Sequence, residues 1–254
     1  MTFPDARAIM AGVALVMCPG WTGSLPGQES VPVRAPELVT DRPDFTESPV
    51  AVPTGAVQLE GGGTWERSEG RHAFSGPEFL ARVGFARGWE LRLGVPDYVD
   101  TAGQAGFGDA SIGLKTELGS TGPWEWGAIL TASLPTAEEG LGSDGVDPEL
   151  LLTTGRGVGP DWSLGTQASV LRRTDVGMTE VGATIVAVRA LGETVGSFLE
   201  VAATGATGDV TSVILHHGYT VSTGALTQLD LHVGAGLTRT APDVLVGVGW
   251  SGRF

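Results

Sequence analysis

The sequence alternates apolar and polar residues from Gly55 to its end. In the first alternating stretch, 57–66, the apolar Val57 and Leu59 stand at odd-numbered positions and the charged Glu60 stands at an even-numbered one. A period of two places successive side chains on opposite faces of a β-strand. The pattern therefore predicts an all-β chain in which each strand has one apolar and one polar face.

About twelve strands are predicted, each near the roughly 9–11 residues that a tilted membrane-spanning strand needs. They are expected at 57–66, 78–85, 89–95, 110–118, 124–134, 146–156, 162–172, 179–189, 194–203, 212–222, 226–238 and 243–254. Short turns, such as 87–88 and 120–123, alternate with longer acidic or Gly-rich connections at 97–109, 136–147 and 172–178. This alternation is typical of an up-and-down barrel with tight turns at one end.

A membrane barrel and a soluble β-sandwich both show alternation, and three features favour the barrel. The apolar faces carry almost no charge at their centres, whereas the polar faces hold Gly, Ser, Thr and scattered charges, as a barrel lumen does. A sandwich would also leave sheet edges open. Aromatic residues mark the strand ends, where membrane proteins carry aromatic girdles: Trp65, Trp89, Trp124, Trp126, Trp162, Tyr219 and Trp250. We therefore predict a transmembrane antiparallel up-and-down β-barrel.

The composition fits this prediction. Charged residues make up 17% of the 254, against about 25% in ordinary soluble domains, and Lys115 is the one lysine. The net charge of −14 argues against nucleic acid as a partner. The single cysteine, Cys18, excludes an internal disulfide framework. No run of 18 or more apolar residues occurs, so no transmembrane helix is expected.

The first residues resemble an export signal. The apolar run "AIMAGVALVMC", 8–18, follows Arg7 and is too short to span a bilayer, so 1–26 is predicted to be a signal peptide. The alternatives are a first core helix and a lipid attached to Cys18. Residues 27–55 are rich in Pro, Gly and Ser and predict an extended N-terminal segment, and 56–254 is then the barrel.

Several motifs resemble one protein family. "ELVTDRPDFTESP" followed by "VPTGAVQLEGG" is similar to the opening of the outer-membrane β-barrel family labelled "Putative MetA-pathway of phenol degradation". "GFGDASIGLKTEL" at 106–118, "ILTASLPT" at 129–136 and the closing stretch 229–254 extend the resemblance, although Gly252 stands where the family often has Tyr. The resemblance implies an outer-membrane transporter that passes small compounds, with aromatic or hydrophobic ones among them.

Catalytic and metal-binding motifs are absent from the sequence: it has no H-E-x-x-H, G-x-S-x-G, C-x-x-C or P-loop pattern. His216 and His217 are adjacent, and neighbours in a strand point to opposite faces, so they are not expected to chelate one ion together. His216 and His232 are expected to face the lumen, the latter beside Asp230. No catalytic residue, metal or cofactor is predicted.

Two groups of charged residues are the candidate functional residues. Seven on the polar faces either neutralise one another or form a selective constriction in the lumen: Glu60, Arg82, Arg92, Lys115, Glu117, Glu200 and Asp230. In "TDRPDFTE" we expect Asp41, Arg42 and Asp44 to order a periplasmic lead-in or to form a plug that enters the barrel and meets Arg82 or Arg92. Phe254, an aromatic at the end of the closing strand, is the predicted assembly signal.

The sequence favours a non-enzymatic outer-membrane pore or transporter for small molecules. The alternative is a plugged structural or binding barrel without transport activity, and a lipid-degrading barrel enzyme lacks an assembled nucleophile. Outer-membrane lipid, the outer-membrane assembly machinery and a small solute are the expected partners, and the oligomeric state is left open.

Overall fold

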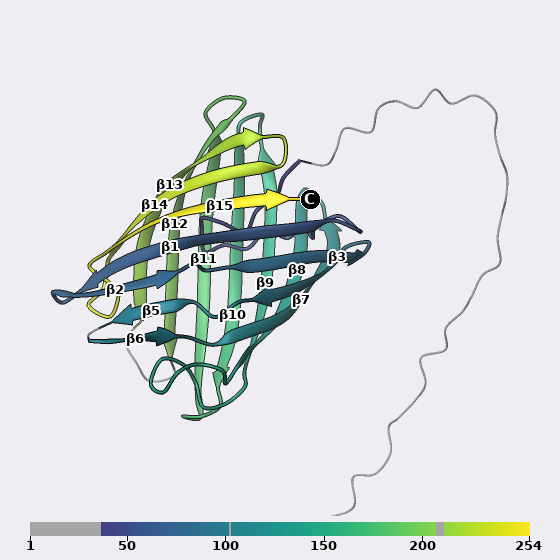
Figure 1. The fold of residues 1–254 in the computed structure, drawn as a ribbon. Helices are drawn as coiled ribbons and strands as arrows, with labels where there is room; N and C mark the ends of the chain where they lie inside the picture. The colour runs from purple at the N-terminus through teal and green to yellow at the C-terminus, as the bar shows by residue number, and fades with distance from the viewer. Residues whose placement is uncertain (1–36, 102, 207–210) are drawn as a thin grey trace, which may run out of the picture. The chain divides into compact units, whose positions relative to one another are not determined.

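The computed structural model describes residues 37–254 except 102 and 207–210. The predicted signal peptide, 1–26, and residues 27–36 of the predicted N-terminal segment lie outside the described residues. The described part contains one antiparallel sheet that closes on itself, because β15 (Val244–Arg253) pairs with β1 (Val57–Ser68). This pairing runs from Gln58 opposite Arg253 to Arg67 opposite Val244, and Figure 1 shows the two strands side by side.

The sheet is a closed 12-strand barrel, as the sequence predicted. Three barrel strands are interrupted and each consists of two segments. These are β2 (Arg71–Gly76) with β3 (Leu80–Ala86), β5 (Tyr98–Thr101) with β4 (Trp89–Gly94), and β6 (Gln104–Phe107) with β7 (Ala110–Thr121). The continuous strands between β7 and β15 are β8 (Trp124–Leu134), β9 (Asp147–Val158), β10 (Trp162–Arg173), β11 (Met178–Ala190), β12 (Val195–Ala206), β13 (Ser212–Gly224) and β14 (Thr227–Gly236).

The structure corrects two details of the prediction, the loop at 97–109 and the alternation of turn lengths. Residues 97–109 were expected to form a long loop, but β5 and β6 pair there and β5 also pairs with β2. Pro77 and Pro96 lie at two of the interruptions, and proline cannot donate a ladder hydrogen bond. The turns also depart from strict alternation of length, because Glu69 and Gly70 alone connect β1 to β2 at the end opposite the Arg87–Gly88 turn.

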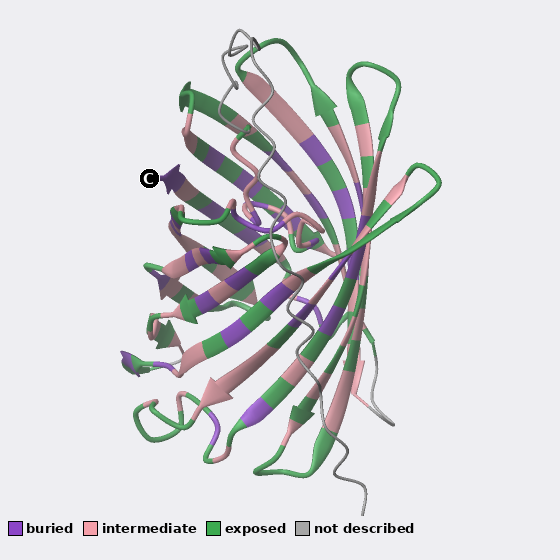
Figure 2. Ribbon diagram, turned by 90° about the vertical axis from the view of Figure 1, so that its right-hand side faces the viewer, coloured by how far each residue is buried: buried purple, intermediate pink, exposed green. Residues whose placement is uncertain are grey.

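The outer surface of the wall is apolar and the inner surface is polar. Exposed and buried residues alternate along the strands (Figure 2), and the exposed ones include many leucines and valines. Trp65, Trp89, Trp162 and Tyr219 are also exposed on this outer surface. An apolar band with aromatic residues is the surface that a barrel presents to lipid. No helix in the described part of the chain is both long and apolar enough to cross a membrane.

From here on, the name N-terminal segment means residues 37–56, which the structure describes. These residues contain no helix or strand and lie inside the barrel. Their backbone N–H groups bond to side chains from β1, β4, β7, β10 and β12. A segment without secondary structure can be buried only if its backbone polar groups find such partners. The polar faces of the strands therefore form the interior into which this segment folds.

Candidate functional site

The seven charged residues singled out in the sequence all lie on the inner surface of the wall. Six of them are buried, and Arg82 and Lys115 are 0% exposed. Glu117 is more exposed, but its carboxylate also reaches inward, to the backbone of Ala51. Burial of so many charges is stable only when they are paired and hydrogen-bonded.

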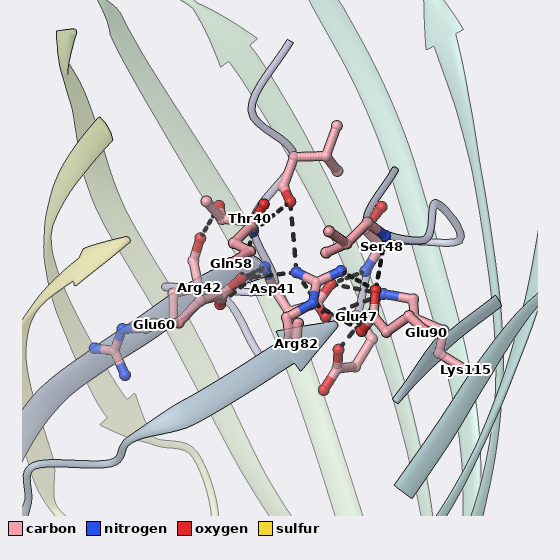
Figure 3. A network of polar contacts seen from close by, with 12 residues as sticks. Thr40, Asp41, Arg42, Glu47, Ser48, Gln58, Glu60, Arg82, Glu90 and Lys115 are labelled. Atoms are coloured by element: carbon pink, nitrogen blue, oxygen red, sulfur yellow. Dashed lines mark hydrogen bonds and ion pairs between the residues drawn. The ribbon is translucent and has the colours of Figure 1, made fainter. Parts of the chain in front are cut away.

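Asp41 joins the N-terminal segment to three cations of the wall, Arg82, Lys115 and Arg92. Figure 3 labels the first two beside Asp41. Its carboxylate oxygens lie 2.6 Å from Nη1 of Arg92, 3.0 Å from Nη1 of Arg82 and 2.9 Å from Nζ of Lys115. These cations come from β4, β3 and β7, which are neighbours in the sheet. One carboxylate of the segment therefore neutralises positive charge contributed by three adjacent strands.

The same environment sets the charge state of Asp41. Burial alone would raise the pKa of its carboxyl, but Arg82, Lys115 and Arg92 outweigh burial and hold the pKa well below its ordinary value. Asp41 is therefore an anion at neutral pH. Asp44 behaves differently, because burial, and then the nearby carboxylate of Glu200, raise its pKa well above the ordinary value.

Four wall glutamates hold the backbone of the N-terminal segment. Glu60 accepts from the N–H of Asp41 at 3.2 Å, and Glu200 accepts from that of Phe45 at 2.9 Å. Glu117 and Glu90 accept from Ala51 at 3.0 Å and Val52 at 2.9 Å, respectively. Carboxylates make stronger hydrogen bonds to N–H groups than neutral acceptors do. These bonds give the segment the partners that a β-ladder would otherwise supply.

Glu90 was not among the candidate residues, although it bonds the segment and both wall arginines. Its carboxylate accepts from Nε of Arg82 at 2.8 Å and from Nη1 of Arg92 at 3.0 Å. The signal was present in the sequence, because Glu90 shares the polar face of its strand with Arg92. Gln58, Thr153 and Gln167 also bond the segment from the wall and were missed because uncharged polar residues are common on any lumen face.

Arg42 connects the N-terminal segment to a further part of the wall, between β14 and the strand formed by β2 and β3. Its Nη1 lies 2.7 Å from Oε2 of Glu78, beside the interruption between β2 and β3, and its Nη2 lies 3.4 Å from Oδ1 of Asp230 on β14. A Cβ at Gly62 or Gly249 would collide with its guanidinium. Glycine at these two wall positions thus leaves room for Arg42.

The histidines form a second polar group. Nδ1 of His216 lies 3.0 Å from Oε2 of Glu200, and its Nε2 lies 2.9 Å from Nδ1 of His232. The ring of Phe45 stacks on His216 with centroids 4.4 Å apart. His217 points away from this group and bonds the carbonyl of Phe198, as opposite faces require. Among the described residues, no group of three or more His, Cys, Asp or Glu side chains could hold a metal ion.

A cavity of about 310 Å³ lies between the N-terminal segment and the wall. Residues 41–45 and Glu47 line it from the segment, and the wall contributes Glu60, Thr64, Glu78, Leu80 and His232. The cavity shows that the segment does not fill the whole lumen. It leaves space of a size that small-molecule sites use.

Comparison with known proteins identifies the family. A sequence model described as "Putative MetA-pathway of phenol degradation" matches residues 40–254. The chain belongs to this family. The match begins at Thr40, so it includes the buried part of the N-terminal segment as well as the barrel. No curated protein matches the sequence significantly.

Solved structures with the same fold are outer-membrane channels of very different sequence. An outer membrane channel from Pseudomonas putida F1 superposes with a TM-score of 0.63 at 13% identity, over 81% of this chain and 97% of that one. The NanC porin gives 0.58 at 6% identity, over 76% of this chain and 98% of its own. The KdgM porin gives 0.56 at 10% identity, over 78% and 99%. At these identities the likeness establishes the fold: a porin-like barrel.

Proposed function

We propose that the protein is an outer-membrane channel that passes small molecules through its lumen. The observation that carries this proposal is a closed barrel with an apolar outer face and a polar, charge-lined interior that retains a cavity of about 310 Å³. The channels and porins that share the fold support it. Diffusion through such a lumen needs no cofactor, and the proposed role is not enzymatic.

The N-terminal segment acts in this proposal as a plug that narrows the lumen. Asp41 anchors it to β3, β4 and β7, and Arg42 anchors it to Glu78 and to β14. Asp44 lines the cavity that remains. The lumen residues then have two roles, since they neutralise one another and hold the plug in place. Solutes pass beside the plug or after its displacement.

Deletion of residues 38–50 tests this proposal. The refolded variant should show several times the single-channel conductance of the wild type in planar bilayers, because a wider lumen offers less resistance. A matched variant replaces 38–50 with Gly and Ser of equal length, which keeps the chain but removes the side-chain anchors, and should also conduct more. Unchanged conductance together with unchanged barrel stability contradicts the plug.

The extensive bonding of the N-terminal segment also favours a second function, that of a plugged structural or binding barrel without transport. The wild-type protein separates the two. A pore gives discrete single-channel currents and lets small sugars swell liposomes, whereas a sealed barrel gives neither. The deletion variant serves as the positive control, because an opened lumen conducts in both cases.

The finer parts of the proposal concern solute and location. The family description and the aromatic lining residue Phe45 support aromatic or hydrophobic compounds as solutes. Export by a signal peptide at 1–26, recognition of Phe254 by the outer-membrane assembly machinery, and insertion into outer-membrane lipid complete it. Heat-modifiable migration of the protein extracted from outer-membrane fractions tests the location.

A further inference from the structure

Tryptophan and arginine alternate across four neighbouring strands of the barrel wall. The four residues, which we call the Trp–Arg row, are Trp124 on β8, Arg156 on β9, Trp162 on β10 and Arg189 on β11. Cζ of Arg156 lies 5.3 Å from the centroid of the Trp124 ring, and Cζ of Arg189 lies 5.3 Å from that of Trp162. In the register of the sheet, Trp162 stands directly opposite Arg189 and diagonally opposite Arg156. Trp162 therefore lies between two cations.

The Trp–Arg row projects from the outer surface of the wall. Successive side chains of a strand point to opposite faces, so residues an even number of positions apart share a face. Leu152 shares the face of Arg156, Ile185 shares that of Arg189, and both of these apolar residues are exposed. Trp162 is also exposed. The row therefore belongs to the apolar surface that meets lipid.

The row lies at the periplasmic end of the barrel. Residues 159–161 connect β9 to β10 and 191–194 connect β11 to β12, so the row adjoins two short turns, which face the periplasm in outer-membrane barrels. β15 ends on the same side, where Arg253 donates to the carbonyl of Glu37 at 3.2 Å. Tryptophans at the ends of membrane strands lie at the level of the lipid headgroups. The row is therefore level with the phosphates of the periplasmic leaflet.

The two arginines have hydrogen-bond donors to spare. Within the part of the chain that the structure describes, neither Arg156 nor Arg189 pairs with a carboxylate. Arg156 makes one long hydrogen bond, 3.5 Å from Nε to the carbonyl of Gly157, and the contacts with tryptophan satisfy no N–H group. A guanidinium has five N–H donors in a fork that matches phosphate. Two such groups side by side on an apolar surface indicate that an anion binds there.

The charge of the whole protein makes this position unusual. The net charge is −14, which by itself repels anions from the surface. Four of the arginines and lysines, Arg42, Arg82, Arg92 and Lys115, are turned inward to carboxylates of the lumen and the N-terminal segment. The Trp–Arg row instead turns two unpaired cations toward lipid. Its complement is an anionic headgroup, since clustered basic residues at a membrane surface attract anionic lipids.

We propose that the Trp–Arg row binds an anionic glycerophospholipid of the periplasmic leaflet, with the phosphate between Arg156 and Arg189 and above the ring of Trp162. Strands lie about 4.8 Å apart, so the two arginines, on strands two apart, start about 10 Å from each other. Their long side chains can close this gap on one phosphate while their methylene groups stay on the apolar wall. The site is on the outside of the barrel and does not depend on the channel function.

Phosphatidylglycerol and phosphatidylcholine with the same acyl chains are the matched probes, because choline neutralises the phosphate that both carry. Native mass spectrometry of the barrel in a neutral detergent should show phosphatidylglycerol binding about tenfold more tightly. The double variant Arg156→Gln/Arg189→Gln should lose this preference. Arg67→Gln/Arg172→Gln is the control, because it removes the same charge from two exposed arginines at the opposite end of the barrel and should keep the preference.

Equal binding of the two lipids to the wild type overturns the inference, and this comparison needs no variant to fold. An equal loss of preference in both double variants overturns it as well, because overall charge would then explain the binding. Displacement of phosphatidylglycerol by an equal concentration of free glycerol phosphate would identify the occupant as a soluble anion and also contradict the lipid site. Trp162→Leu should weaken phosphatidylglycerol binding severalfold, and unchanged binding would remove the tryptophan from the site.

Discussion

Nζ of Lys115 lies 2.9 Å from Oδ1 of Asp41, and both side chains are buried inside the barrel. The two residues are 74 positions apart in the chain. Lys115 is the one lysine of the protein, and it is used to bind the N-terminal segment rather than to solvate the surface. The ion pair therefore connects the N-terminal segment to the wall, and its loss should affect both stability and conductance.

Asp41→Asn should release the N-terminal segment. The substitution leaves Arg82, Arg92 and Lys115 close together without the anion that they share, and removal of one partner from a buried ionic cluster costs about 3 kcal/mol. We expect the free energy of unfolding in urea to fall by that amount and the single-channel conductance to rise toward that of the 38–50 deletion. Asp144→Asn, a change to an exposed loop carboxylate, is the control and should alter neither.

The pH dependence of stability gives a second test of Asp41. Its pKa is held below the ordinary value, so its contribution to stability is complete above about pH 4 and is lost as the pH falls through the lowered pKa. Burial, and then the charge of Asp41, raise the pKa of the neighbouring Glu47 to about 8, so both proteins should carry Glu47→Gln to remove this second titration. In that background the difference in unfolding free energy between the protein with Asp41 and the Asp41→Asn variant should stay constant from about pH 7 to pH 5 and shrink only in stronger acid. A difference that already declines between these two values would contradict the lowered pKa.

Gly84→Ala should displace the N-terminal segment without changing any charge. A Cβ at this position of β3 would collide with the carbonyl oxygens of Val52 and Pro53, and backbone atoms cannot move aside as a flexible side chain can. We expect higher conductance and a loss of about 1–3 kcal/mol of unfolding free energy. Gly157→Ala on β9 is the matched control, because nothing lies within 4 Å of its Cβ. Equal effects of the two substitutions would show that the collision is not responsible.

Arg42 and Glu78 should be energetically coupled. Their ion pair joins the N-terminal segment to the interruption between β2 and β3. The side chains are 14% and 21% exposed, so solvent screens the pair partly. A double-mutant cycle with Arg42→Ala and Glu78→Ala should give a coupling free energy of about 1 kcal/mol. The same cycle with Arg71 and Glu69, which are 3.9 Å apart and mostly exposed, should give a value near zero.

The strands and their faces could be predicted because a period of two assigns each side chain to the lumen or to lipid from local sequence alone. That rule placed Glu60, Arg82 and His216 on the inner surface. The interrupted strands could not be found in this way, since β5 and β6 have only four residues each and lie among glycines. Side-chain partners in the lumen also depend on register. His232 was expected beside Asp230 but bonds His216, because Gly218 lies opposite His232 and makes the two histidines diagonal neighbours.

Phe254→Ala should lower the yield of inserted protein more than the stability of the inserted barrel. The backbone of Phe254 pairs with Val57 at 2.8 Å and 3.0 Å, and alanine keeps both hydrogen bonds. Its ring is 70% exposed and makes few native contacts, so the free energy of unfolding should change by less than about 1 kcal/mol. Because we propose that the assembly machinery recognises this ring, the amount of heat-modifiable protein in outer membranes should fall severalfold. Phe85→Ala removes a ring that is 54% exposed on β3, and it should leave this yield unchanged. Equal losses for both variants would mean that Phe254 acts only as one more lipid-facing aromatic residue.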